Sequence, residues 1–304
     1  MLSFIIRRLL MIIPMALLVI TLTWALVRIA PGNFYTQEKK LPPAVEENIK
    51  KKYGLDKPWY QQYGIMMWNV VRGDFGSSLK YEGQTVNEII WRHFPYSATI
   101  GILAYVLALL IGLTAGVIAS LKQNSIFDYG STSLAMLGLS VPNFVLGPLL
   151  VLVFSFWLYW LPPARWSLAG LVLPVVTLAA IYAAYIARLT RAGMLEVMRS
   201  DYIRTARAKG LDEKTVLLRH GLRGGIIPVV SFTGPALAAL LAGTVVVEKV
   251  FAIPGLGNIF IQSVLNRDEP LVLGIVAFLS ILIMVFNLLV DISYGFLDPR
   301  IRYE

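Results

Sequence analysis

Long uninterrupted runs of apolar residues constrain this chain more than any other feature of its sequence. Each run has about the length of helix, roughly 20 residues, that crosses a bilayer core of about 30 Å. Because lipid offers the backbone no hydrogen-bond partners, such runs are expected to be α-helices. The runs occupy residues 9–27, 97–121, 134–161, 168–188, 226–247 and 271–294. The sequence therefore predicts an all-α polytopic membrane protein with six transmembrane helices.

The composition agrees with this interpretation. Hydrophobic residues make up 57% of the chain and charged residues 15%, whereas soluble domains are about 45–50% apolar and about 25% charged. The net charge of +9 is carried mainly by loops between the apolar runs. There it favours contact with lipid headgroups over contact with nucleic acid. We therefore expect the lipid bilayer, and no nucleic acid, as a partner.

The positions of Lys and Arg predict the orientation of the chain. Arg7 and Arg8 precede the first run, which is too long for a signal-peptide core. The segment 188–223 carries nine Lys or Arg, whereas the two short segments expected on the other side, 162–167 and 248–270, carry three in total. This bias has the sign of the positive-inside rule. The N- and C-termini are therefore predicted to be cytoplasmic.

Four segments follow from this topology. They are an N-terminal transmembrane helix at 1–30, an external insertion at 31–95, a five-helix core at 96–294 and a cytoplasmic tail at 295–304. The core includes a cytoplasmic loop at 189–225.

The external insertion has helical signals of its own. A helix is predicted over 44–53, and a second one presents Trp59, Tyr63, Met66 and Val70 on one face. A third, over 85–93, is expected to end before Pro95. The insertion is interpreted as a structural cap or as a docking surface for an external partner, and the sequence leaves both open.

The sequence shows no pattern typical of an ATP-binding site, a metal site or a proton-coupled carrier. It contains no GxxxxGK[ST] phosphate-binding loop. Its two histidines, His93 and His220, are expected on opposite sides of the membrane, so they predict no shared metal site. Asp291 and Arg28 lie only near the ends of apolar runs, and the lack of carboxylates within the runs disfavours a gradient-driven carrier. We predict no catalytic residue, no metal and no cofactor bound by this chain, and the substrate-binding residues stay unknown.

The basic loop contains a candidate contact site for a partner. Ser200 or Asp201 can cap the start of a helix, and Gly210 can end it. Asp212 can cap a second helix running toward Leu222. Such a short helix would suit a groove in a partner, and a solvated loop held by headgroups is the alternative. The candidate residues are Asp201, Tyr202, Ile203, Arg204, Thr205, Ala206, Arg207, Ala208, Lys209 and Gly210.

Small residues recur within the apolar runs. Gly112 and Gly116 form a GxxxG pattern, which is typical of closely packed membrane helices. Pore lining is the alternative interpretation.

The basic loop also carries a family resemblance. Residues 202–210, followed by Arg219-His220 and Ile227-Pro228, resemble the EAA motif of ABC-importer permeases, in the form found in the dipeptide/oligopeptide/nickel permease family. Thr205-Ala206-Arg207 stands where the general pattern has Glu-Ala-Ala. Further matches occur in order along the chain, among them Gly73-Asp74-Phe75-Gly76 and the segment 251–257. The whole pattern is most similar to the B-type subunit of the oligopeptide branch.

The resemblance implies a type I ABC importer permease fold with an external helical insertion after the first helix. It implies a channel subunit, in a bacterial inner membrane, of an ATP-driven importer that takes oligopeptides from an external binding protein. The implied partners are a second, homologous permease, two subunits that bind ATP and Mg, and that peptide-binding protein. The ten candidate residues would then contact an ATPase. A dipeptide or nickel importer, or a gradient-driven secondary transporter, is the alternative.

Overall fold

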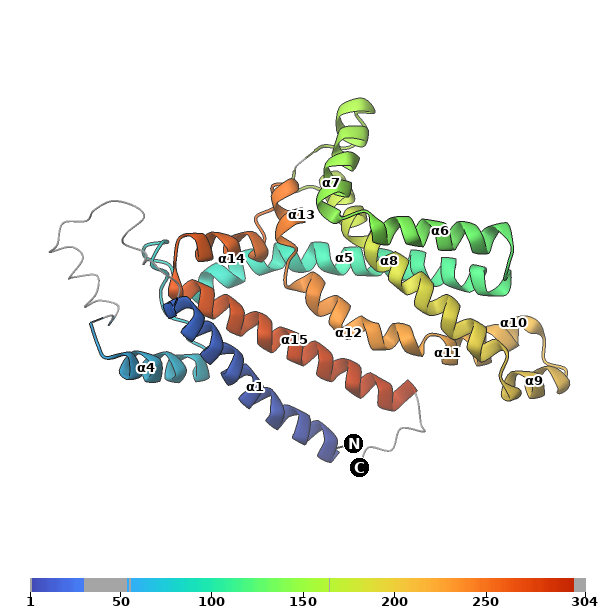
Figure 1. Ribbon diagram of the computed structural model, residues 1–304, viewed down its shortest axis with the longest axis horizontal. Helices are drawn as coiled ribbons and strands as arrows, with labels where there is room; N and C mark the ends of the chain where they lie inside the picture. Colours follow the sequence, from blue (N-terminus) through green and yellow to red (C-terminus); the bar gives the residue numbers. More distant parts are fainter. Residues whose placement is uncertain (1, 30–53, 55, 164, 298–304) are drawn as a thin grey trace.

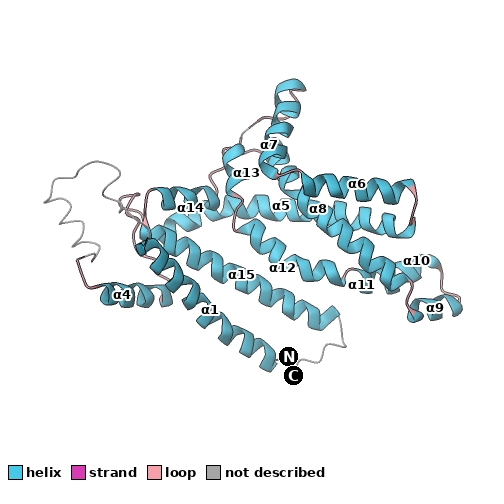
Figure 2. Ribbon diagram, in the orientation of Figure 1, coloured by secondary structure: helices cyan, strands magenta, loops and turns pink. Residues whose placement is uncertain are grey.

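The regular structure of the protein is helical. The computed structural model describes residues 2–29, 54, 56–163 and 165–297 (Figure 1). Within these ranges the only β-type pairing is an isolated bridge between Ser77 and Thr85, and Figure 2 shows helices throughout the body. The prediction of an all-α chain is confirmed for the described residues.

Five spans are long and apolar enough to cross a membrane. One of them combines two consecutive helices, α12 and α13. The helices are α1 (Leu2–Ile29), α5 (Val86–Leu121), α8 (Leu168–Met198), α12 (Ile227–Leu241) with α13 (Val245–Val250), and α15 (Glu269–Leu297). Figure 1 shows short helices at the two ends of this bundle. We call the end that carries α4 (Trp59–Val71) the α4 end and the end that carries α9 (Asp201–Ala208) the α9 end.

The third apolar run is not one straight span. It forms α6 (Ile126–Ser140) and α7 (Asn143–Val151), continued by the π-helix η1 (Leu152–Trp157), with a bend of 102° between the two parts. Pro142 lacks an N–H group and disfavours helical geometry at the residue before it. Val141 accordingly has an extended backbone. The predicted count of six spans holds only if this bent pair is one span.

The expectation that a helix stops before Pro95 is wrong. Thr85 and Glu88 form a capping box at the start of α5, and the helix then continues through Pro95 for 36 residues. Burial on both sides of the proline offsets its cost, because Ile89 and Ile90 pack in one apolar cluster and Ile100 in another. The expected division between insertion and core at residues 95 and 96 therefore falls inside a single helix.

The rest of the insertion is described only in part. The helix predicted around Trp59 is confirmed as α4 (Trp59–Val71). The helix expected over 44–53 lies outside the described residues. At the other end of the chain, α14 (Leu256–Leu265) occupies a segment that was expected to be a loop.

The most extensive helix contact of the bundle joins α5 to α8. A Cβ atom built on Gly116 would lie 2.5 Å from Thr190 Cβ and 2.6 Å from the Ala187 carbonyl oxygen. A Cβ atom on Gly112 would lie 2.7 Å from Ile186 Cβ. These distances are shorter than van der Waals contact, so the GxxxG pattern serves close packing, as the first of its two interpretations predicts.

Gly116→Ala is therefore expected to destabilise the protein by about 1–3 kcal/mol, because the added methyl group overpacks the α5–α8 contact. This corresponds to a fall of several degrees in the thermal midpoint, at about 2–4 °C per kcal/mol for a chain of comparable size. The matched control is Gly130→Ala in α6, where a Cβ atom meets nothing within 4 Å. Thermal unfolding of the purified protein in lipid nanodiscs measures both, and equal midpoints would contradict the packing role.

Candidate coupling site

The predicted contact segment begins immediately after α8 and forms α9 (Asp201–Ala208). Ser200 occupies the N-cap position, but its hydroxyl donates to the Val197 carbonyl oxygen at 2.6 Å and caps no N–H of α9. The expected role of Ser200 as a side-chain cap is therefore wrong. Asp201 lies in the first turn, where a negative charge favours the N-terminal end of a helix.

Gly210 ends α9 as predicted. Its φ of 76° lies in the left-handed region, and its N–H donates to the Arg207 carbonyl oxygen at 2.9 Å. The next N–H, of Leu211, donates to the Ala206 carbonyl oxygen at 3.4 Å. These two bonds form the Schellman motif, which commonly ends a helix at a glycine.

One face of α9 is buried against the rest of the loop. Ile203 and Ala206 are buried and cluster with Val216, while Val197 and Met198 at the end of α8 pack against the same cluster. α9 is therefore fixed both to α8 and to the π-helix η2 (Val216–Gly221).

The opposite face of α9 is exposed. Arg204 pairs with Asp201 at 2.6 Å, and Arg207 pairs with Glu213 at 2.7 Å, in contacts open to solvent. The structure thus brings all ten predicted residues onto one short helix and its terminating turn, at the tip of the α9 end (Figure 1). Eight of them are exposed: Asp201, Tyr202, Arg204, Thr205, Arg207, Ala208, Lys209 and Gly210.

The second helix of the loop also begins as predicted. The Asp212 carboxylate accepts the Thr215 N–H at 3.1 Å and caps α10 (Glu213–Thr215). Hydrogen bonds from Thr215 lower the pKa of Asp212 below its ordinary value. Because the pKa of Asp212 is lowered in the folded protein, its carboxylate contributes its full stabilisation above the ordinary carboxyl pKa. This stabilisation is lost as the pH falls through the lowered pKa. The chain continues through η2 into α11 (Leu222–Gly225).

Backbone contact joins α8 to α11. A Cβ atom on Gly193 would lie 2.3 Å from the Gly225 carbonyl oxygen, so the two helices meet where neither has a side chain. We call residues 191–225, which contain the end of α8 with α9, α10, η2 and α11, the coupling block.

A partly buried ion pair connects the coupling block to α6. Arg191 contacts Asp128 through two nitrogens, Nε to Oδ1 at 2.6 Å and Nη2 to Oδ2 at 2.8 Å. Asp128 is buried and also accepts the Asn124 N–H at 2.9 Å. Arg199 adds a hydrogen bond to Gln123 at 3.0 Å. Sequence reasoning missed this pair because it placed Asp128 in a loop before the third run.

Two other carboxylates are buried at or near the α4 end. Glu248 accepts the Ser97 hydroxyl at 2.7 Å and the Asn258 N–H at 2.8 Å, which ties α13 to α5 and α14. Asp268 accepts the Leu79 N–H at 3.1 Å and holds the loop before α5 against α15. All three carboxylates lie just outside the apolar runs, so the expectation that the runs themselves lack carboxylates is not contradicted, and each of the three has hydrogen-bond partners. Among the described residues, no three His, Asp or Glu side chains gather as a metal site.

Arg191→Ala is expected to cost about 1–3 kcal/mol, because it removes two hydrogen bonds from the buried Asp128 carboxylate, although Arg191 itself is only partly buried. Arg204→Ala, which breaks the solvent-exposed pair with Asp201, is expected to cost at most about 1 kcal/mol. The thermal midpoints of the two variants measure the contrast. Equal, small shifts of the two thermal midpoints would show that Arg191 does not stabilise the buried Asp128 carboxylate.

Known proteins resemble this chain in both sequence and fold. Residues 108–303 match the family model of the binding-protein-dependent transport system inner membrane component, and residues 1–100 match the model of its N-terminal part.

The chain is 44% identical to the oligopeptide transport system permease proteins OppB of Haemophilus influenzae and Escherichia coli, over the whole length of each protein. It is 42% identical to the dipeptide transport system permease protein DppB of Bacillus subtilis, over 94% of this chain and 93% of that relative.

Among solved structures, an inward-facing methionine ABC transporter, MetNI, aligns with a TM-score of 0.55 at 18% identity, over 69% of this chain and 96% of that one. An amino acid ABC transporter aligns with a TM-score of 0.53 at 19% identity, over 69% and 94%. These likenesses support the expected ABC importer permease fold. Together with the sequence matches, they identify the chain as a multi-pass membrane protein of the binding-protein-dependent transport system inner membrane component family.

Proposed function

We propose that this chain is one of two homologous permease subunits that enclose the pathway of an ATP-driven oligopeptide importer. The partners in this proposal are a second permease, two subunits that bind ATP and Mg, and a peptide-binding protein outside the membrane. The observation that carries the proposal is the exposed face of α9, presented on a helix that is itself packed firmly against a membrane span. The full-length similarity to oligopeptide permeases supports the choice of substrate.

In this proposal the α9 end faces the cytoplasm, where ATP is available. The concentration of Lys and Arg in the coupling block supports that orientation. The exposed residues of α9 then contact an ATPase subunit. ATP drives the change only if it binds the two conformations of the complex with different affinity.

The coupling block gives this contact a route to the membrane spans. Because Ile203 and Ala206 are packed against the end of α8, a displacement of α9 moves α8 with it. α8 is about 46 Å long at 1.5 Å per residue and packs along α5. The Arg191–Asp128 pair carries the same displacement to α6.

The size of the substrate is the finer part of the proposal. The dipeptide permease of Bacillus subtilis is almost as similar to this chain as the oligopeptide permeases are, so dipeptides are the second candidate. We expect the complete complex, reconstituted in liposomes with its binding protein, to import labelled tetra- and pentapeptides in an ATP-dependent manner. Uptake of dipeptides alone would favour the second candidate. Uptake that needs an ion gradient and no ATP would refute the proposal.

Gly210→Val is expected to reduce peptide transport at least tenfold, because a β-branched residue in the left-handed region costs about 1–2 kcal/mol and displaces the end of α9. The matched control is Gly210→Asn, since asparagine tolerates this conformation. A Cβ atom at Gly210 meets nothing within 4 Å, so the two variants differ in backbone strain and not in steric clash at Cβ.

ATP-dependent uptake and ATP hydrolysis by the reconstituted complex measure the effect of both variants. Normal transport by Gly210→Val, in a complex that retains its ATPase subunits, would contradict the proposed role of this turn in coupling.

A further inference from the structure

α4 is the one long helix of the described chain that buries none of its residues. Its 13 residues, Trp-Tyr-Gln-Gln-Tyr-Gly-Ile-Met-Met-Trp-Asn-Val-Val, include no charged side chain. Lys57 and Arg72 flank it closely. A helix that lay wholly in water would be expected to carry charges on its outer face, so this composition calls for an apolar or interfacial surrounding.

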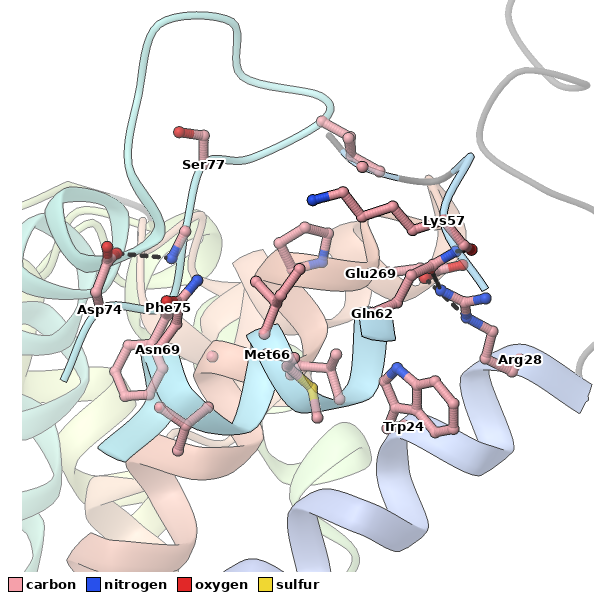
Figure 3. A pocket seen from close by; sticks show the side chains of 18 residues that line it. Trp24, Arg28, Lys57, Gln62, Met66, Asn69, Asp74, Phe75, Ser77 and Glu269 are labelled. Atoms are coloured by element: carbon pink, nitrogen blue, oxygen red, sulfur yellow. Dashed lines mark hydrogen bonds and ion pairs between the residues drawn. The ribbon is translucent and has the colours of Figure 1, made fainter. Parts of the chain in front are cut away.

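The inner face of α4 packs beside α1. The Tyr63 hydroxyl lies 2.8 Å from the Thr21 hydroxyl, and the ring centroids of Trp24 and Tyr63 lie 5.2 Å apart. Gln62 accepts a hydrogen bond from Arg28, near the end of α1. Farther along, Met66 and Asn69 face an open cavity of about 350 Å³ lined by α1, α4, α15 and the loop before α5 (Figure 3).

These contacts place α4 beside the membrane-spanning part of α1. Thr21 lies eight residues before Ile29, the last residue of α1, which is about 12 Å along a helix axis. Leu22 and Leu26, at the same level of α1, are more than half exposed, as expected for side chains that face lipid. α4 therefore runs alongside the last turns of a span rather than beyond them.

The outer face of α4 is apolar and aromatic. Tyr60, Gly64, Trp68 and Val71 follow one another at spacings of four, four and three, which places them on one side of the helix. Tyr60, Trp68 and Val71 are 57%, 58% and 70% exposed. Tyrosine and tryptophan are the residues that gather at membrane–water interfaces.

The Arg72 guanidinium carbon lies 4.5 Å from the centroid of the Trp68 ring. This contact places a cation beside the aromatic face. A long basic side chain at a helix end can reach the headgroups from there.

We propose that α4 is a partly inserted interfacial helix whose outer face, Tyr60, Gly64, Trp68 and Val71, binds phospholipid at the α4 end of the bundle. Lipid is the occupant that the contacts favour, because α4 packs on Thr21 and Trp24 of α1, at the level of the exposed Leu22 and Leu26. A docked protein is the competing occupant. The inference concerns a different end of the molecule from the coupling block, so it stands or falls independently of the proposed function.

The chain contains no cysteine, so a spin label on a single introduced cysteine reports on one position of this chain. Gly64→Cys places it on the outer face of α4, where a Cβ atom meets nothing within 4 Å. Leu22→Cys on α1 is the reference for lipid, and Glu82→Cys, in the exposed loop before α5, is the reference for water. The protein is the full complex, with other cysteines removed, in nanodiscs of phosphatidylethanolamine and phosphatidylglycerol.

The measurement is the collision rate of each label with oxygen, which concentrates in lipid, and with a water-soluble nickel chelate. We expect the oxygen-to-nickel ratio at Gly64→Cys to be several-fold above that at Glu82→Cys and close to that at Leu22→Cys. A ratio like that of Glu82→Cys would overturn the proposal. So would a label that becomes inaccessible to both reagents only when the external binding protein is added, because the face would then dock a protein.

Discussion

The contact between α5 and α8 is the most extensive helix contact of the bundle and holds its two longest helices together. At Gly116 and Gly112 the two longest helices approach so closely that a single added Cβ atom on either glycine would overlap α8. Helices in lipid gain little from the hydrophobic effect and associate mainly through such close packing. The α5–α8 pair packs as one unit. The Ser97–Glu248 contact connects the region near the α4 end to α5, and the coupling block begins at the end of α8.

The connections at the two ends of this pair differ in chemistry. At the α9 end, α8 joins α11 through backbone contact at Gly193 and Gly225 and joins α6 through the Arg191–Asp128 pair. At or near the α4 end, single carboxylates hold helices and loops together, Glu248 between α13, α5 and α14 and Asp268 between α15 and the loop before α5. A buried carboxylate that has lost its partner is costly. These contacts therefore resist separation of the helices and loops that they join.

Local features of the chain were predictable, and features that depend on distant partners were not. The apolar runs predicted the spans, and the glycine and aspartate at 210 and 212 predicted where α9 ends and α10 begins, because these effects act within a few residues. The roles of two prolines depended on packing. Pro95 is tolerated inside α5, where residues both before and after it in the helix are buried, whereas Pro142 lies at a bend of 102°.

The ion pairs and carboxylate contacts were missed for the same reason. Asp128 and Arg191 are 63 residues apart in the chain, and Ser97 and Glu248 are 151 apart. No local pattern marks such pairs, and both carboxylates were assigned to loops. The position of α4 was likewise open, since its sequence suited either a cap or a docking surface, and only its contacts with α1 place it beside a span.

Photo-cross-linking can test whether the exposed face of α9 contacts an ATPase subunit. A benzophenone attached to Ala208→Cys would lie on that face, and the same group on Glu82→Cys, at the α4 end, provides the control. In intact membranes we expect Ala208→Cys to give a light-dependent product that joins this chain to an ATP-binding subunit, and Glu82→Cys to give none. Capture of that subunit from Glu82→Cys, with none from Ala208→Cys, would contradict this expectation.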